Sequence, residues 1–313
     1  MNYQNSTIKT IVILLGISLL ISCNNSKTEL RLVFANKVNY ESFIIAKQKG
    51  YFNEAENTIS IQTVNSGIQA AEAFTTGSAD IIGTGNGPAV ILMSKNSEIR
   101  ILTRYATGEK MHRLIADTSI HTYAALKGKR IGIQQGSSTH AALLTWLHTN
   151  NISLDSVSLI AMEPANMPEA VKNKQLDAIA GSEPWALNVE KLCGNTVYEL
   201  SNLYDKNNSQ SHVLVSTAKI SKEHKQQIEA IINGLEKANK FIKNNPKESA
   251  EIVSKSIGLT VDEQMLCTSR LNWSIGWEAT DEQSLAETAK TLFQLKKISE
   301  IPKIKDFISS DFK

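Results

Sequence analysis

The sequence has almost no excess charge and few aromatic residues. Its 313 residues include 33 Lys or Arg and 31 Asp or Glu, which gives a net charge of +2, and aromatic residues make up 6%. Nucleic-acid-binding proteins usually concentrate basic residues on one surface, and this chain has no basic run interleaved with aromatics. We therefore expect no nucleic-acid partner, and any site that stacks on a ligand must be local.

The common nucleotide, metal and triad motifs are also missing. No G-x-x-x-x-G-K-[ST] occurs, and Pro88 stands where a dinucleotide-binding turn over residues 83–88 would need its last glycine. The six histidines lack metal-binding spacing with one another or with cysteine. His140 follows Ser137 and Ser138, but no acid that would orient it is identifiable. These absences predict a protein that is not an enzyme and needs no cofactor or metal.

Cysteine is scarce, with three in the whole chain. Cys193 ends an expected helix, and Cys267 lies in a helical stretch of the C-terminal region. An exported protein could pair them, although such a bond would tie distant parts of the chain together. We expect two buried free thiols instead, because free cysteine is commonly buried.

The N-terminus predicts an export signal followed by a lipid attachment site. Lys9 precedes an apolar core over residues 11–21, which is too short for a spanning helix of roughly 20 apolar residues. The four residues ending at Cys23 resemble a bacterial lipobox. We expect a lipoprotein signal peptide over 1–22, with the lipidated Cys23 and a tether over 23–29. An ordinary secretory signal with an incidental cysteine is the alternative.

Residues 66–93 read as helix, strand, loop and helix. Ser66 and Gln69 have the spacing of a capping box, residues 79–83 form a short apolar strand, and Pro88 is expected at the start of a second helix. Both helices begin just after a strand. Their unpaired N–H groups and helix dipoles would attract an anion.

The same plan recurs over residues 174–187, where an Asp enters an apolar strand and a Pro opens a helix. Because the preceding elements also correspond, we infer an α/β protein with two lobes of similar plan. Chance similarity between strand–turn–helix units is the alternative. Residues 99–105 and 113–116 are expected strands of the first lobe, and the helical stretch after 221 is expected to pack on a lobe.

Several short motifs occur in an order and spacing typical of one family. Together they resemble the substrate-binding proteins of ABC importers for aliphatic sulfonates, taurine and nitrate, over about residues 30 to 295. The motifs lie at 46–52, 79–83, 85–89, 126–132, 136–138 and 183–185.

The resemblance implies a type II periplasmic-binding-protein fold, in which two crossing segments join two α/β lobes around a ligand cleft. Lobe I would comprise 30–116 plus 212–313, and lobe II 117–211. The resemblance further implies an exported, lipid-anchored monomer. It would capture a small anionic or zwitterionic solute and deliver it to an ABC permease and ATPase.

By the same resemblance, the solute would meet the loops that follow the strands. No Arg lies in these loops, and Lys37 is their only cation, which favours sulfonate or nitrate held by neutral donors over phosphate. The expected ligand-binding residues are Asn36, Asn39, Ser66, Gly67, Gly85, Asn86, Gly87, Ser137, Ser138, Thr139 and Glu183.

Glu183 is unusual in an anion site. A carboxylate there suggests a zwitterion such as taurine, whose amine it would bind; alternatively, Glu183 only complements the N-terminus of its own helix. Trp273 and Trp277 could cover an apolar part of the solute, or pack in a core. Trp185 and Tyr40 carry the same two interpretations.

Three other functions fit the resemblance in part. The chain could bind a thiamine-precursor pyrimidine for import. It could be an enzyme on the same fold, such as a thiamine-pyrimidine or menaquinone-pathway enzyme, although the pyrimidine enzyme's cysteine-rich motif is absent. It could also be an exported sensor without a transporter.

Overall fold

The computed structural model describes residues 29–53, 59–203 and 210–312. The expected signal peptide, Cys23 and most of the tether lie outside these ranges. Within them, no helix has both the length and the apolar character needed to cross a membrane.

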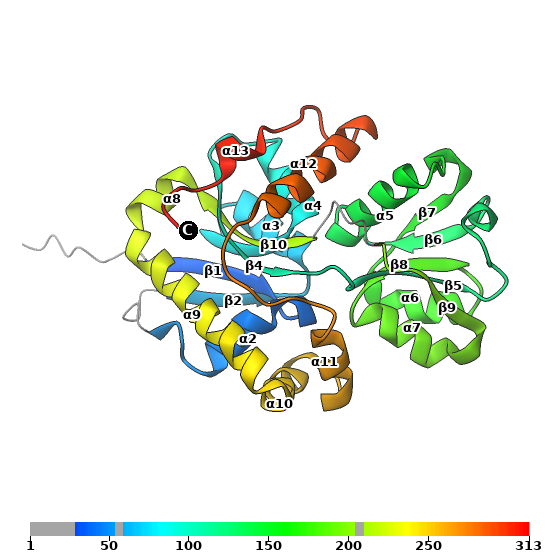
Figure 1. Ribbon diagram of the computed structural model, residues 1–313, viewed down its shortest axis with the longest axis horizontal. Helices are drawn as coiled ribbons and strands as arrows, with labels where there is room; N and C mark the ends of the chain where they lie inside the picture. Colours follow the sequence, from blue (N-terminus) through cyan, green and yellow to red (C-terminus); the bar gives the residue numbers. More distant parts are fainter. Residues whose placement is uncertain (1–28, 54–58, 204–209, 313) are drawn as a thin grey trace, which may run out of the picture.

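Two five-stranded sheets form the centres of two lobes (Figure 1). The strand orders are β2-β1-β3-β10-β4 and β7-β6-β8-β5-β9. In each sheet, three neighbouring strands are parallel and the fourth is antiparallel to them. The first sheet contains β1 (Leu30–Ala35), β2 (Ile59–Val64), β3 (Ile81–Gly85), β4 (Ile99–Thr107) and β10 (Ser211–Thr217). The second contains β5 (His112–Asp117), β6 (Arg130–Ile133), β7 (Ser158–Ala161), β8 (Ala178–Ser182) and β9 (Val197–Ser201). The two lobes therefore share one plan, as the repeated sequence pattern predicted.

The chain crosses between the lobes earlier than expected. The prediction that residues 113–116 form a strand of the first lobe is wrong, because β5 pairs with β8 and β9 of the second sheet. Ser211 likewise belongs to β10 of the first sheet. Sequence pattern alone did not distinguish a hairpin partner of β4 from a strand that enters another sheet. The first crossing consequently lies between Thr107 and His112.

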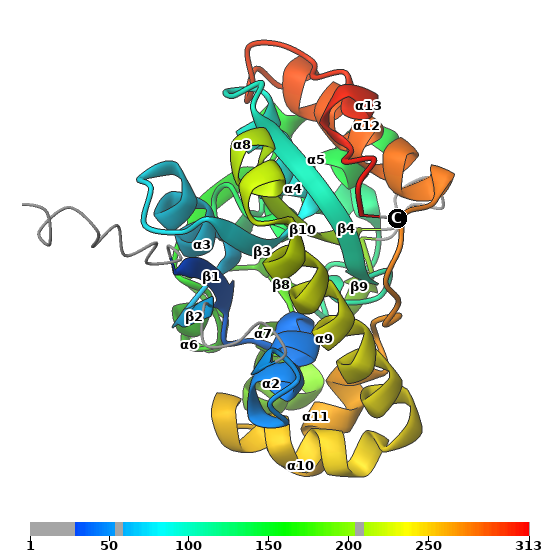
Figure 2. The same ribbon diagram turned by 90° about the vertical axis from the view of Figure 1, so that its left-hand side faces the viewer.

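Helices cover both faces of the first sheet, and the C-terminal helices complete this lobe, as predicted. Figures 1 and 2 show α10 and α11 at one end of the lobe and α12 and α13 at the other. One core joins Phe34 and Phe43 to Leu235 of α9, and the other joins Val33 and Val90 to Leu285 of α12. The helices are α2 (Glu41–Gln48), α3 (Gly67–Thr75), α4 (Asn86–Met93), α8 (Ala218–Glu223), α9 (Lys225–Asn244), α10 (Pro246–Ile257), α11 (Val261–Thr268), α12 (Ala279–Gln294) and α13 (Ile304–Phe307).

The second lobe has its own cores on the two faces of its sheet. Leu143 and Trp146 of α5 pack on one face, and Val171 and Val189 of α6 and α7 on the other. Its helices are α5 (Ser138–Thr149), α6 (Met167–Lys172) and α7 (Trp185–Cys193). Short 3-10 helices span Val38–Tyr40, Tyr123–Leu126, Leu154–Ser156, Pro164–Asn166 and Gly194–Thr196.

Most expected helix caps are present. Ser66 caps α3 by accepting from the Gln69 N–H, and Thr260 and Glu263 form the predicted capping box of α11. The Gln69 side chain, however, accepts from the backbone N–H of Asn65 instead of Ser66. Helix α4 begins at Asn86, before Pro88, and β3 continues to Gly85 because it keeps pairing with β10.

Both described cysteines are free thiols, as expected. Cys267 is buried in the first-lobe core, as expected, whereas the expected burial of Cys193 is wrong, because it is only half-buried at the end of α7. Burial raises the pKa of both thiols, that of Cys267 to about 12. Neither thiol is therefore a thiolate at neutral pH, which agrees with a packing role.

Candidate functional site

A pocket lies between the two lobes, at the ends of the strands that lead into α3, α4 and α5. It encloses about 410 Å³ of empty space, counting the part open to solvent, and both lobes line it. The edge of an α/β sheet where parallel strands end is also where such folds bind ligands.

Several predicted residues line this pocket from opposite lobes. Gly85 at the end of β3 meets the first turn of α5 so closely that an added Cβ would lie 2.1 Å from Ser138 Oγ. Gly67, at the start of α3, is equally constrained, since its Cβ would lie 2.6 Å from the Tyr40 hydroxyl. Glycine is therefore needed at both positions. The predicted lining residues are Asn39, Gly67, Gly85, Ser137, Ser138 and Thr139.

Other predicted residues are engaged in structural contacts and do not line the pocket. Asn36 Nδ2 donates to the Ser256 carbonyl at 2.7 Å, and Asn86 Nδ2 donates to Thr288 Oγ1 at 3.0 Å. Ser66 is buried as the cap of α3. Gly87 packs against α5, because its Cβ would lie 3.1 Å from the Ala141 Cβ. Sequence position located these residues at strand ends but did not reveal which way each one points.

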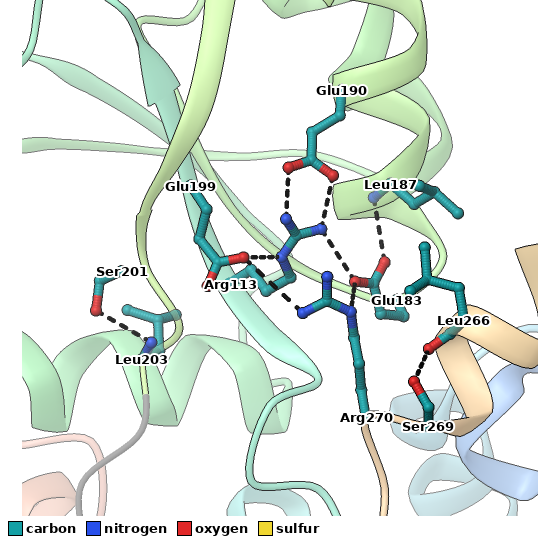
Figure 3. A network of polar contacts seen from close by, with 10 residues as sticks. All are labelled: Arg113, Glu183, Leu187, Glu190, Glu199, Ser201, Leu203, Leu266, Ser269 and Arg270. Carbon is teal, nitrogen blue, oxygen red and sulfur yellow. Dashed lines mark hydrogen bonds and ion pairs between the residues drawn. The ribbon is translucent and has the colours of Figure 1, made fainter.

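Glu183 is also absent from the pocket lining, and its carboxylate belongs to a buried ionic network (Figure 3). Arg113 lies 3.1 Å from Glu183 and also pairs with Glu190 and Glu199, while Arg270 lies 3.0 Å from Glu183. Burial raises the pKa of Glu183, and the charges of the two arginines oppose that rise.

The other Glu183 oxygen accepts from the Leu187 N–H in the first turn of α7 at 3.1 Å. The interpretation of Glu183 as a residue that complements its own helix is therefore confirmed. Its oxygens are taken up by the two arginines and this N–H, so the pocket offers no reason to expect a solute amine there.

Electrostatics make the pocket favourable for an anion. Lys37 lines it, is half-buried, and has no salt bridge within the described ranges. Burial lowers the pKa of Lys37 to about 8, and the carboxylate of Glu163 partly opposes this. The first turns of α3 and α5 add Gly67 and Ser138, where helix N–H groups and dipoles favour negative charge. No Asp or Glu is among the described lining residues.

Two histidines that no sequence motif marked as site residues also line the pocket. His112 and His212 are buried, one at the start of β5 and one in β10, with ring centroids 6.3 Å apart. His112 Nδ1 lies 2.7 Å from Thr139 Oγ1, and His212 Nε2 lies 3.2 Å from Met111 Sδ. Burial lowers their pKa values to about 3 and about 4, so both are neutral near pH 7.

The two histidines meet because the two segments that cross between the lobes lie side by side. They are far apart in the sequence, so no motif with a fixed spacing could have paired them. The polar lining is completed by Gln134, Ser182 and Tyr40. Of the four aromatic residues that were expected either to contact the solute or to pack in a core, Tyr40 lines the pocket and the three tryptophans do not. Trp273 and Trp277 pack against the two first-lobe cores and do not line this pocket.

Comparison with known proteins gives a consistent result. A protein of Bacillus subtilis (strain 168) named as a putative aliphatic sulfonates-binding protein is 26% identical to this chain over 282 residues. The match covers 86% of this chain and 82% of that protein. The alkanesulfonate-binding protein SsuA from Xanthomonas axonopodis pv. citri, solved bound to MOPS, superposes with a TM-score of 0.80 at 21% identity. That match covers 90% of this chain and 98% of SsuA.

The periplasmic aliphatic sulphonate binding protein SsuA from Escherichia coli gives a TM-score of 0.79 at 19% identity, covering 90% of this chain and 92% of that one. The two structural matches confirm the periplasmic-binding-protein fold with its two α/β lobes. Residues 37–249 match the family described as NMT1/THI5 like. The chain therefore belongs to the NMT1/THI5-like family.

Proposed function

We propose that this protein is the exported solute-binding component of an ABC importer and that its solute is a small oxoanion of the sulfonate class. The pocket between the lobes carries the proposal. It combines Lys37 with the first turns of α3 and α5 and has no carboxylate among its described lining residues. The relatives named for aliphatic sulfonates support the same class of solute.

The energetics require several contacts acting together. Each helix N-terminus contributes about 0.3–1 kcal/mol toward holding an anion, whereas micromolar affinity needs about 8 kcal/mol. Hydrogen bonds to a charged group contribute about 1.5–3 kcal/mol each, and Lys37, Ser138 and the backbone N–H groups are suitable donors. Enclosure between the lobes supplies the remainder by excluding water from these contacts.

Both lobes must contribute for the site to be complete. Ala141 and Leu144 of α5 belong to the same apolar core as Val90 of α4 and Leu285 of α12. This packing joins the lobes beside the pocket, so closing the lobes buries apolar surface and brings Ser138 to Gly85. We infer that solute capture and lobe closure occur together, and that the closed form is the one delivered to the permease and its ATPase.

The pocket favours a binding protein over an enzyme. Among the described lining residues, no carboxylate is present to orient His112 or His212 as a general base, which a hydrolytic triad would require. A protonated aminopyrimidine would likewise need a carboxylate partner, so the pocket supports an anion better than a thiamine-precursor pyrimidine.

We also propose that the protein acts as a monomer held at a membrane by a lipid on Cys23. The apolar core over 11–21 and the lipobox-like residues before Cys23 support this anchor. Extraction of cells with a detergent that separates membrane and aqueous proteins tests it. The wild type should enter the detergent phase and Cys23→Ser should not; a wild type found only in the aqueous phase would contradict the anchor.

A thermal-shift panel tests the proposed solute class. Alkanesulfonates, taurine, nitrate, bicarbonate and pyrimidines would each be added to the purified protein. A specific ligand at about a hundred times its dissociation constant adds about 2.7 kcal/mol of stability, which a melting curve resolves easily. We expect an alkanesulfonate to stabilise the protein. Stabilisation by a pyrimidine alone would overturn the proposal.

A further inference from the structure

His212 presents one particular nitrogen to the pocket. It lies in β10 directly opposite Gly85 of β3, and both residues line the pocket. A Cβ added to Gly85 would lie 3.4 Å from His212 Nδ1 and 2.1 Å from Ser138 Oγ. The nitrogen that faces the bare side of Gly85 and the start of α5 is therefore Nδ1.

The contact on the other side of the ring favours one tautomer. His212 Nε2 lies 3.2 Å from the Met111 sulfur, and a thioether has lone pairs but no proton to donate. The contact is a hydrogen bond only when Nε2 carries the proton, which favours that tautomer. A neutral imidazole has a single N–H, and burial lowers the pKa of His212 to about 4, so Nδ1 carries a free lone pair near pH 7.

This lone pair has no protein partner. His212 is only 1% exposed, and Nδ1 is buried without a hydrogen bond in the described part of the chain. A buried acceptor left unpaired is costly, and a solute that donates to it recovers that cost. His112 Nε2 is also buried without a hydrogen bond in the described part of the chain, but the His112 Nδ1 contacts the Thr139 hydroxyl, which can either donate or accept, so this contact selects neither tautomer.

The surroundings decide which kind of donor fits. An ammonium group would be desolvated without a counter-charge, because no Asp or Glu is among the described lining residues and Glu183 is committed to Arg113 and Arg270. Lys37 in the same pocket would also repel it. A neutral hydroxyl or amide N–H avoids both the cost of desolvating a charge without a counter-charge and the repulsion by Lys37.

We propose that the solute carries a neutral O–H or N–H donor close to its anionic group and that His212 Nδ1 accepts a hydrogen bond from it. The simplest solute of this kind is a hydroxyalkanesulfonate. This inference rests on the proposed function, since it assumes that an anion occupies the pocket, and it names His212 as a residue that determines which anion is preferred.

Three sulfonates of nearly equal size test the inference on the wild-type protein by calorimetry. Isethionate ends in a hydroxyl, propanesulfonate in a methyl group and taurine in an ammonium. We expect isethionate to bind about tenfold more tightly than propanesulfonate, the effect of a hydrogen bond worth about 1.4 kcal/mol, and taurine to bind more weakly than isethionate. Equal affinities for isethionate and propanesulfonate would overturn the inference while leaving the proposed function standing.

Two variants test the role of His212 itself. In His212→Leu, which has no acceptor, the ratio of the isethionate and propanesulfonate affinities should fall to near one. In His212→Asn, whose Oδ1 can take the position of Nδ1, much of the preference should return. An unchanged ratio in His212→Leu would overturn the role of this residue. If none of the three sulfonates binds the wild type, the proposed function fails and this inference fails with it.

Discussion

Arg270 reaches from the first lobe into the second, where its Nε lies 3.0 Å from Oε1 of the buried Glu183 (Figure 3). The Arg270 N–H does not point along this contact, so the interaction is an ion pair without an aligned hydrogen bond. Arg270 follows α11, whose Cys267 belongs to the first-lobe core, whereas Glu183 follows β8 of the second sheet. The pair therefore joins the lobes outside the pocket.

Removing this link should weaken lobe closure. In Arg270→Ala, Glu183 keeps Arg113 but loses one of its two cations, and we expect the free energy of unfolding to fall by about 1–3 kcal/mol. Solute affinity should fall about tenfold, because part of the binding energy would then be used to hold the lobes together. Urea unfolding and calorimetric titration measure the two effects.

Lys191→Ala provides a matched control for Arg270. Lys191 pairs with Glu263 between the same lobes, but its side chain is 53% exposed, so its loss should cost well under 1 kcal/mol. If Lys191→Ala destabilised the protein as much as Arg270→Ala, burial of the Glu183 network would not be the reason for the effect.

Lys37 should make anion binding depend on pH. Burial lowers the pKa of Lys37 to about 8, so its positive charge is present at neutral pH and is lost as the pH rises through about 8. A bound anion stabilises the charged form, so the titration should move upward in the complex. Calorimetry between pH 7 and pH 10 should therefore show affinity decreasing toward the alkaline end.

Replacing Lys37 removes this dependence. In Lys37→Met we expect affinity to fall about 10- to 100-fold, the effect of losing a hydrogen bond from a charged group, and the alkaline decrease to disappear. Lys47→Met, at an exposed position of α2, is the control and should bind like the wild type. An unchanged pH profile in Lys37→Met would rule out Lys37 as the charge that holds the anion.

Gly85 limits how closely the lobes approach. In Gly85→Ala the new methyl group would lie 2.1 Å from Ser138 Oγ and 3.0 Å from Ser138 Cβ, so Ser138 must move and the lobes must separate slightly from the observed packing. We expect solute-induced stabilisation to be lost and the radius of gyration in solution scattering to increase. Adding Ser138→Gly removes both contacts and should restore the compact form. A Gly85→Ala protein as compact as the wild type would contradict this account.

The two lobes also carry equivalent ion pairs that predict acid sensitivity. Arg31 and Asp80 in the first lobe form a bidentate pair, and Arg130 and Asp177 form its counterpart in the second. Desolvation by itself would raise the pKa of Asp80. The hydrogen bonds from Arg31 and its positive charge together outweigh this effect and lower the pKa of Asp80 below its ordinary 3.8.

The stability that this pair provides is therefore present above pH 3.8 and is lost as the pH falls through the lowered pKa. Asp80→Asn should reduce stability at pH 7 by about 1 kcal/mol, and the difference from the wild type should shrink at pH 2 to 3. Urea unfolding at both pH values measures it. A difference that grows on acidification would have the wrong sign for this mechanism.

Local sequence signals predicted the elements and their caps well. The strand at Ile59–Val64, the cap at Ser66 and the capping box at Thr260 depend on residues close together in the chain, and all three are observed. The repeated Asp before β3 and β8 also marked the two lobes correctly. In each lobe this Asp pairs with an Arg at the start of a neighbouring strand.

Side-chain direction and contacts between distant segments could not be predicted in this way. Asn36 and Asn86 lie at strand ends as expected, yet each donates to a C-terminal helix far along the chain. His112 and His212 meet only because two crossings lie side by side at the pocket. Glu183 was recognised as unusual, but its partners Arg113 and Arg270 have no local relationship to it in the sequence.

A crystal structure of the protein grown with an alkanesulfonate would show whether the pocket between the lobes is the binding site. We expect the sulfonate between the lobes, with its oxygens within hydrogen-bonding distance of Lys37 Nζ and of N–H groups in the first turns of α3 and α5. A sulfonate found only on the outer surface, or a pocket without it at saturating concentration, would show that this pocket is not the anion site.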